Sequence, residues 1–551
     1  MPLYKRKWRH LIFFSLLLVG LLAGSQLQGQ YCKRSKHLEI FADILKELER
    51  YYVDEVDPDV IVKTGIDEML RSLDPYTSFL PEEVLESFKT STIGEYGGIG
   101  AMIGKRKDKS IIYMLYKDCP AHKGGLRVGD EITQVNGEDI TDSPIAHVSS
   151  LLKGMPNTSV QLSVIRHGVE KPLALTLTRE KVTLKNVPYY GQPRQGIGYI
   201  RLANFTTHAA DEVKTALASL KEAGAHKLIL DLRGNPGGIL EEAISVVNLF
   251  IDQDLTVLTT KSKVAALAKS YVTTQPAYDQ ATPMVVLIDG QSASAAEIVA
   301  GVIQDYDRGV LIGKNTFGKG LVQTTRPLSY NTQLKLTTAK YYIPSGRSIQ
   351  KIDYSRQRQE NATEDGADVP KQVFMTQAGR KVDDGNGIAP DIATEQLGLA
   401  PITMSLLREG LIFDYATLFQ AQHDGIQPAR EFGLSNAQYN HFVAWLKDKD
   451  YAYTIEPSID QLLQQAQSES YTEDIQKHIA SLKTQVQRHK AEDLQKFKAE
   501  IKRILQEAII VRYYFQEGAI EAMLDHDQHI QKACALFHNM PQYHQRLKAT
   551  E

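Results

Sequence analysis

A serine and a lysine that can form a catalytic pair stand 25 positions apart (319 − 294 = 25) near the middle of the chain. The apolar run Met284 to Ile288 is typical of a buried strand, and Asp289-Gly290-Gln291 breaks it before small and apolar residues follow at helical spacing. This order predicts that Ser294 lies at a helix N-terminus, where free N–H groups and the dipole favour developing negative charge. Lys319 follows a second apolar run, in a turn bounded by glycines.

The pairing of these two residue types is what points to chemistry. A serine hydroxyl becomes a strong nucleophile only when a neighbouring base removes its proton. Lysine can be that base only in its neutral form, which requires desolvation in an apolar pocket. Phe317, Leu321 and Val322 are compatible with such a pocket around Lys319. Taken alone, Ser294 is typical of a helix cap and Lys319 of a solvated turn residue.

The stretches SASAAEI, QDY and TFGKGLVQ resemble the signature of the C-terminal processing peptidases. These are Ser-Lys serine proteases of the periplasm, the thylakoid lumen and the cell envelope. The match extends over roughly residues 38–392. The resemblance implies that Ser294 is the nucleophile and Lys319 the general base. It also implies that Gln323 orients the lysine and that Asp305 is a supporting carboxylate.

A glycine pair, Gly237-Gly238, stands between a predicted strand that ends at Leu232 and an apolar helix. Such a turn can present backbone N–H groups to a reacting oxygen, although a simple strand-to-helix connection is the alternative. The resemblance implies that this turn supplies one donor of an oxyanion hole and that Ala295 supplies the other. The sequence does not decide which of the two glycine amides points inward.

The elements around these motifs predict an α/β multidomain fold. Strands and helices alternate over residues 196–349, which predicts βαβ units and a largely parallel sheet. The resemblance implies a ClpP/crotonase-like protease core with an inserted PDZ domain, an N-terminal helical segment and a C-terminal helical extension. A polar stretch, 353–384, is expected to be an insertion loop. The expected boundaries are 31–90 for the N-terminal segment, 91–182 for the PDZ domain, 183–398 for the core and 399–551 for the C-terminal domain.

The PDZ resemblance rests on an ordered set of motifs within residues 94–181. A glycine-rich loop, made of Gly97, Gly98, Ile99 and Gly100, would offer backbone amides to a peptide's terminal carboxylate. An Asn-Gly pair at 136–137 predicts a hairpin turn. Three apolar residues that would line the groove favour a ligand with an apolar end: Ile99, Met102 and Leu151.

Both ends of the chain carry information beyond the core. Residues 1–30 have the layout of a secretory signal, with basic residues before an apolar run and small residues after it. This predicts export to the periplasm or cell envelope, with the segment either cleaved or kept as an inner-membrane anchor. Apolar residues between Ile475 and Leu505 form a near-heptad seam, which either packs within the chain or joins two subunits.

Several function classes lack support in the sequence. A net charge of −3 gives no electrostatic case for nucleic acid. The chain has three cysteines and no CxxC or HExxH pattern, so neither a metal site nor a cofactor is expected. A Ser-His-Asp arrangement would have to use His208 or His226, which lie outside recognisable motifs, and the GxSxG elbow is absent.

The leading hypothesis is a serine endopeptidase that cleaves exported proteins near their C-termini, with the substrate tail recruited by the PDZ domain. The alternative is a catalytically silent PDZ scaffold that binds protein C-termini in the cell envelope; its mark would be a replaced nucleophile or base, and neither is replaced. A third hypothesis keeps the protease but lets the PDZ domain block the site until a C-terminal peptide binds. The expected partners are substrates with exposed C-termini, an adaptor or activator, and further copies of the chain.

Overall fold

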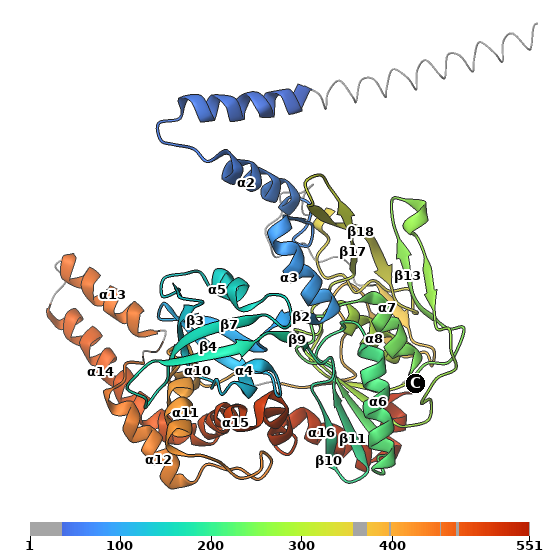
Figure 1. The fold of residues 1–551 in the computed structure, drawn as a ribbon. Helices are drawn as coiled ribbons and strands as arrows, with labels where there is room; N and C mark the ends of the chain where they lie inside the picture. The colour runs from blue at the N-terminus through green and yellow to red at the C-terminus, as the bar shows by residue number, and fades with distance from the viewer. Residues whose placement is uncertain are drawn as a thin grey trace, which may run out of the picture. The chain divides into compact units, whose positions relative to one another are not determined.

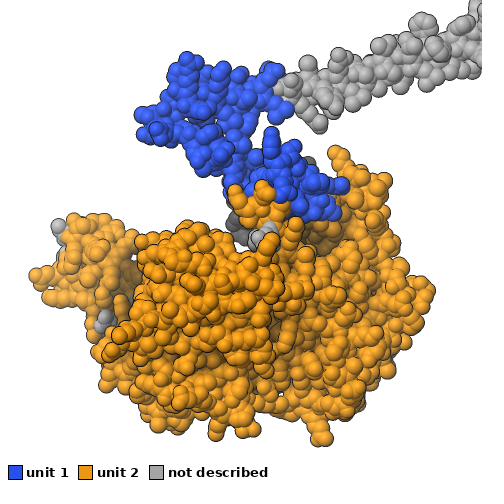
Figure 2. All heavy atoms as spheres, viewed as in Figure 1, with its two compact units in different colours: residues 1–81, 324–337, 354–360 blue, residues 82–323, 338–353, 361–551 orange. Residues whose placement is uncertain are grey.

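The computed structural model describes residues 36–355, 372–395, 398–451, 453, 455–469 and 473–549, and the chain divides into two compact units (Figures 1 and 2). The smaller unit holds the described residues up to Pro81 together with Thr324–Thr337, and the larger unit holds nearly all the rest. The expected export segment, 1–30, lies outside the described residues. Within the described part of the chain, every helix is too short or too polar to span a bilayer.

The smaller unit contains helices, one short strand and, in Thr324–Thr337, the adjoining ends of two further strands. Residues 36–51 are helical and α2 (Pro58–Arg71) follows, with the Asp57 carboxylate capping its first N–H groups. The Asp74 carboxylate then accepts from the N–H groups of Tyr76 and Thr77 and fixes the turn into β1 (Ser78–Leu80). This unit confirms the expected N-terminal helical segment.

A six-stranded sheet forms the centre of the larger unit. Its first pair is antiparallel and all its other pairs are parallel, as the alternation of strands and helices predicts. In spatial order its strands are β10 (Tyr189–Arg194), β11 (Ile197–Arg201), β12 (Lys227–Asp231), β15 (Met284–Ile288), β16 (Val310–Gly313) and β21 (Ile392–Ala393).

Both faces of this sheet are buried at its centre, because β15, β16 and residues 228–230 of β12 are apolar and buried at successive positions rather than at alternate ones. Leu230 and Val286 face one core cluster, whereas their neighbours Ile229 and Val285 face another. The first cluster includes α6 (Ala209–Glu222), α7 (Leu240–Asn248) and α8 (Ala295–Asp305). The second includes α16 (Gln528–His538) and α17 (Met540–Arg546), from the C-terminus of the chain (Figure 1).

A second sheet and a small hairpin complete the core. The sheet joins β13 (Thr256–Lys261), β14 (Ser270–Val272), β17 (Leu321–Pro327) and β18 (Gln333–Tyr342), and the first residues of β18 pair with β1 of the smaller unit. The hairpin, β19 (Val373–Met375) with β20 (Lys381–Asp383), lies where the sequence predicted an irregular loop. Each of its strands has three residues and Val382 is its one buried apolar residue, too little for an alternating pattern to be recognised.

The expected PDZ domain follows α3 (Glu82–Ile93) and has its own apolar core. Asn136 and Gly137 both have positive φ, 53° and 84°, as the predicted hairpin turn requires. The short pair β2 (Glu95–Gly98) and β9 (Glu180–Thr183) closes the domain at its two ends. Its other elements are β3 (Ala101–Arg106), β4 (Lys109–Leu115), α4 (Pro120–Lys123), β5 (Glu131–Val135), β6 (Glu138–Asp139), α5 (Ile145–Leu152), β7 (Ser159–Ile165) and β8 (Leu173–Thr178).

The C-terminal region is helical, as expected, but its apolar seam does not lie on one continuous helix. The chain breaks at Phe497, between α14 (Glu473–Lys496) and α15 (Lys498–Met523). Seam residues before the break pack on α13 (Ile455–Ser468), and those around and after it enter the helical core. The other helices of that core are α10 (Pro401–Arg408), α11 (Leu411–Gln422) and α12 (Asn436–Trp445).

Candidate active site

Ser294 occupies the turn between β15 and α8, where the sequence placed it. Its backbone has φ 54° and ψ −113°, a conformation that L-residues rarely adopt. Such a backbone costs of order 1–3 kcal/mol and persists only when the surroundings fix it. Ser294 is partly exposed, whereas Ala293 and Ala295 on either side are buried. The turn therefore presents one hydroxyl-bearing residue at the head of a buried helix.

Glu297 holds the serine turn and the lysine turn together. Its side chain is fully buried and accepts from the N–H of Ser294 at 2.8 Å. It also accepts from the N–H of Gly318 at 2.6 Å and from that of Lys319 at 2.9 Å. The Thr316 hydroxyl is a fourth donor, at 2.6 Å. Burial raises the pKa of this carboxyl, against the lowering effect of its four donors.

Tyr341 makes a second connection between the same two turns. Its buried hydroxyl donates to the carbonyl oxygen of Lys319 at 2.9 Å and lies 3.4 Å from that of Ser294. Lys319 is partly buried and lies two residues before the first residue of β17. Gln323, also partly buried, is the third residue of that strand. Residues 294 and 319 are thus tied together at the backbone, through one carboxylate and one phenol.

The glycine turn reaches the serine turn from the neighbouring strand. Gly237 has φ 96°, and a Cβ added to it would lie 2.8 Å from the Ser294 Cβ and 2.9 Å from the Ala295 nitrogen. The Gly237 N–H itself donates to the Asn235 side chain at 2.8 Å. The N–H groups of Gly238 and Ala295, in contrast, have no acceptor among the described residues. The geometry therefore favours Gly238 over Gly237 as the donor beside Ala295.

Asn235 and Ser292 fix the two turns against each other. The Asn235 side chain is fully buried and donates to the carbonyl oxygen of Leu202 at 2.8 Å. The backbone carbonyl oxygen of Asn235 accepts from the N–H of Ala293 at 2.9 Å. The Ser292 hydroxyl donates to the carbonyl oxygen of Leu232 at 2.8 Å. The backbone around Ser294 is consequently over-determined, which accounts for its strained conformation.

A buried ionic network supports the glycine turn from the other side of the sheet. Asp231, at the end of β12, accepts from Arg233 at 2.6 Å and from the Tyr199 hydroxyl at 2.7 Å. Burial alone would raise the pKa of Asp231, but its two arginine partners lower it well below its usual range. Arg233 also donates to Asp527, the residue that caps α16, at 2.7 Å. The C-terminal helices are thereby connected to the turn beside Ser294.

Asp305 lies at the last residue of α8, at the opposite end of the helix from Ser294. It accepts from the fully buried Arg347 at 2.9 Å and from the N–H of Ser345. Eleven residues of helix separate the two ends by about 16 Å. The geometry gives Asp305 a part in holding α8 in place, at a distance from the reacting atoms.

The two histidines of the core lie in solvent-exposed positions. His208 precedes α6 and pairs with Asp211 at 3.3 Å, with both side chains largely exposed. The ring of His226 is exposed and lies 3.4 Å from the carbonyl oxygen of Gly224. Among the described residues, neither ring forms a hydrogen bond or ion pair with the serine turn, so the geometry offers no support for a Ser-His-Asp arrangement.

In the glycine-rich loop of the PDZ domain, Gly97 and Gly98 belong to β2 and pair with β9, whereas Ile99 and Gly100 follow that strand. The carbonyl oxygens of Gly97, Ile99 and Gly100 accept from backbone N–H groups of the domain. The N–H groups of Ile99 and Gly100 have no acceptor within the described part of the chain. β3, which follows the loop, is an edge strand whose one partner is β4. A peptide can therefore add along β3 and place its terminal carboxylate on this loop.

Several residues of the site escaped the sequence analysis. Glu297 had a recognisable signal, because Ser294 and Glu297 have the spacing of a capping box. Asn235 and Arg233 lie in the turn after β12, where only the two glycines, Gly237 and Gly238, gave a signal in the sequence. Tyr341 and Asp527 had no local signal, since each meets the site through a contact distant in sequence.

Three family profiles match successive parts of the chain. Peptidase family S41 matches residues 196–359, a PDZ domain matches 111–166, and a probable PDZ-protease C-terminal helical domain matches 402–537. A carboxy-terminal-processing protease of Bartonella bacilliformis is 36% identical over 345 residues, which are 62% of this chain and 79% of that protein. A probable CtpA-like serine protease of Staphylococcus aureus is 34% identical over 59% of this chain and 65% of its own.

Two solved structures are similar in part. A photosystem II D1 C-terminal processing protease is 25% identical, with a TM-score of 0.35 over 64% of this chain and 92% of that one. The PDZ domain of a carboxy-terminal protease from Vibrio cholerae, solved in complex with a peptide, is 32% identical. That match has a TM-score of 0.16 and covers 16% of this chain and 99% of the domain.

Proposed function

Because the chain belongs to the carboxy-terminal-processing protease family, we propose that it is a serine endopeptidase with a Ser294–Lys319 dyad. The observation that carries the proposal is that the Glu297 carboxylate accepts hydrogen bonds from the backbone N–H groups of both Ser294 and Lys319. Two turns that are separate in sequence meet there, beside two amides without acceptors. Acyl transfer needs a nucleophile, a base and donors for the oxyanion, and Ser294, Lys319 and the two amides can supply them.

The reaction proceeds through an acyl-enzyme. The neutral amine of Lys319 takes the proton of the Ser294 hydroxyl as the oxygen attacks the scissile carbonyl carbon. The N–H groups of Gly238 and Ala295 stabilise the negative charge on the carbonyl oxygen. The lysine then returns the proton to the leaving amine, and water, deprotonated in the same way, releases the acyl group from Ser294. Gln323 orients the lysine.

The substrate is a protein or peptide with an exposed C-terminus. The PDZ domain supports this class, because its loop amides can receive a carboxylate and its edge strand can pair with a peptide. We infer from the signal-like residues 1–30 that the substrates are exported proteins of the periplasm or cell envelope.

The test compares the wild-type chain with its Ser294→Ala and Lys319→Ala variants on an unstructured protein that ends in apolar residues. Mass spectrometry of the products gives the cleaved bonds. We expect cleavage near the C-terminus by the wild type and a loss of at least about 10³-fold in both variants, because each removes a member of one catalytic unit. His208→Ala is the matched control and retains full activity.

Three other outcomes of this cleavage experiment would each contradict one part of the proposal. Activity that survives in Lys319→Ala excludes this lysine as the base. Activity lost in His208→Ala points to a histidine-dependent enzyme. Binding of the substrate without cleavage by any form favours the scaffold hypothesis, in which the PDZ domain is the functional site.

A further inference from the structure

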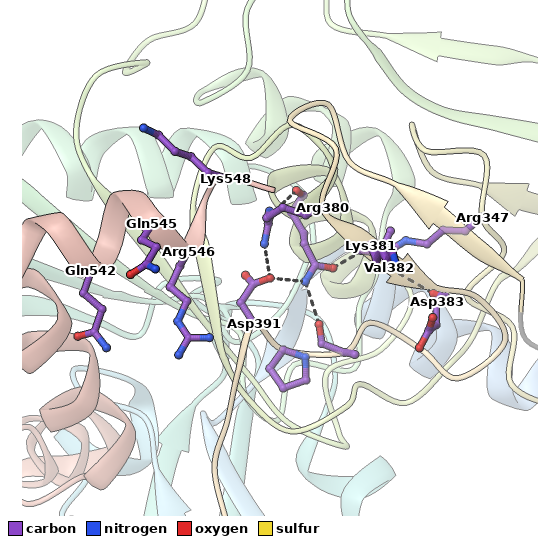
Figure 3. Close-up of a pocket in the computed structure, with 13 residues that line it drawn as sticks. Arg347, Arg380, Lys381, Val382, Asp383, Asp391, Gln542, Gln545, Arg546 and Lys548 are labelled. Carbon is purple, nitrogen blue, oxygen red and sulfur yellow. Dashed lines mark hydrogen bonds and ion pairs between the residues drawn. The ribbon is translucent and has the colours of Figure 1, made fainter. Parts of the chain in front are cut away.

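A cleft of about 530 Å³ opens between the β19–β20 hairpin and α17, at the end of α8 distant from Ser294 (Figure 3). Its lining is polar and predominantly basic. The cationic side chains come from three separate segments of the chain and converge on one space: Arg347, Arg380, Lys381, Arg546 and Lys548. Nothing in the proposed peptidase reaction uses this cleft.

Arg347 is the deepest of these cations and has an unused donor. Its side chain is 1% exposed. One terminal nitrogen donates to Gln304 at 2.8 Å and to Asp305 at 2.9 Å. Its Nε is buried with no hydrogen-bond partner among the described residues. A buried donor left unpaired is costly, so an acceptor brought to this nitrogen would remove that cost.

The carboxylates deep in the cleft are paired with buried arginines. Asp391 accepts from Arg380 at 2.5 Å, from Gln304 at 2.9 Å and from the N–H of Leu311 at 2.7 Å. Arg380 also pairs with Asp307 at 2.5 Å. Arg347 and Arg380 together face three carboxylates, Asp305, Asp307 and Asp391, so this network keeps a net charge of −1.

The solvent-facing part of the cleft keeps an excess of positive charge. Lys381, Arg546 and Lys548 form no ion pair with any carboxylate in the described part of the chain. Asp383 is the one opposing group that is also unpaired there. Three cations against one carboxylate give this surface a charge of +2, and with the −1 of the network beneath it the cleft has a net charge of +1. Gln542 and Gln545, on α17, add neutral amide donors (Figure 3).

We propose that this cleft binds a multivalent oxyanion of the phosphate class. Its donors come from the strand β20, from α17 and from the turn after β18, so they surround a ligand on several sides. A tetrahedral oxyanion accepts hydrogen bonds in this way, and guanidinium groups match it well. The volume is larger than a single phosphate group needs, which favours a pyrophosphate or an organic phosphate.

The test is calorimetric titration of the purified chain with pyrophosphate in metal-free buffer, with sodium chloride at matched ionic strength as the blank. We expect saturable binding near one ligand per chain. Arg546→Gln and Lys381→Gln, both at exposed positions, each raise the Kd about tenfold, because each removes a charged donor. Lys263→Gln removes an exposed cation outside the cleft and leaves the Kd unchanged.

Further titrations separate this proposal from the alternatives. Ser294→Ala binds pyrophosphate as the wild type does, so a failure of the proposed peptidase would not affect the result. Tighter binding of a triglutamate peptide than of pyrophosphate would overturn the phosphate assignment. An absence of saturable heat, or equal affinity in Arg546→Gln, Lys381→Gln and Lys263→Gln, would overturn the site itself.

Discussion

Gly237 shows how closely the two turns of the candidate active site approach each other. Its backbone is left-handed, with φ 96°. A Cβ added to Gly237 would lie only 2.8 Å from the Cβ of Ser294. A side chain at this position would enter the space next to the nucleophile. The sequence predicted a glycine turn for its free amides, whereas the structure assigns Gly237 to the close approach and Gly238 to the free amide.

We therefore expect Gly237→Ala to lower kcat at least about 10²-fold, because it displaces the amides of the oxyanion hole. Cleavage kinetics on a C-terminal peptide measure the change. Gly224→Ala is the control, since Gly224 has a similar φ of 86° but open space around it. That variant should lose stability, by about 1 kcal/mol for the left-handed backbone, and keep its kcat. Full activity in Gly237→Ala would contradict the assignment.

At the scale of elements, α16 acts as a support for the turn after β12. Its cap, Asp527, is 7% exposed and pairs with Arg233. Burial by itself would raise the pKa of Asp527, but the hydrogen bond from His529 and the charge of Arg233 lower it to about 2. The folded protein therefore prefers the ionised carboxylate, and this preference stabilises the fold above the ordinary pKa of aspartate.

Asp527→Asn tests this support. The wild type should exceed the variant in free energy of unfolding by about 2 kcal/mol at pH 7. Because the folded pKa is lowered, this advantage is present above about pH 4 and is lost as the pH falls towards 2. Urea unfolding at pH 7, 4 and 3 measures the difference.

Asp525→Asn provides the comparison at a more exposed site. Asp525 pairs with Arg430 and Arg194, and its side chain is 29% exposed. A surface ion pair of this kind contributes about 0–1 kcal/mol. Equal losses in Asp525→Asn and Asp527→Asn, or a loss that does not depend on pH, would contradict a specific role for the α16 cap.

At the scale of the whole molecule, the chain's last helices complete its central sheet. Ile229, Val285 and other residues on one face of that sheet are covered by α16 and α17. The Tyr543 hydroxyl also accepts from the N–H of Met284 and lies 3.1 Å from that residue's carbonyl oxygen. The C-terminal helices are thus part of the core that is built on this sheet.

Phe537→Ala should destabilise the protein by about 3–5 kcal/mol, because Phe537 is fully buried in this layer. Leu482→Ala, on the α14 seam, is the matched control. Leu482 is 43% exposed, so its truncation should cost less than about 0.5 kcal/mol. Thermal unfolding followed by circular dichroism compares the two. Similar losses in both variants would show that α16 is not integral to the core.

The sequence alone determined the features that local patterns encode. The strand before Ser294, the helix after it, the lysine turn and the parallel sheet follow from apolar periodicity and from glycines at turns. The order of motifs likewise determined the presence and place of the PDZ domain. These signals are short-range, so a single chain displays them without reference to its fold.

Only the tertiary structure decided which groups meet. It placed Glu297 and Tyr341 between the two turns, left the Gly238 amide without an acceptor, and brought α16 and the basic cleft to the core. Each of these contacts joins residues that are distant in sequence. Their energies depend on distance, burial and hydrogen-bond direction, which no periodic pattern in the chain records.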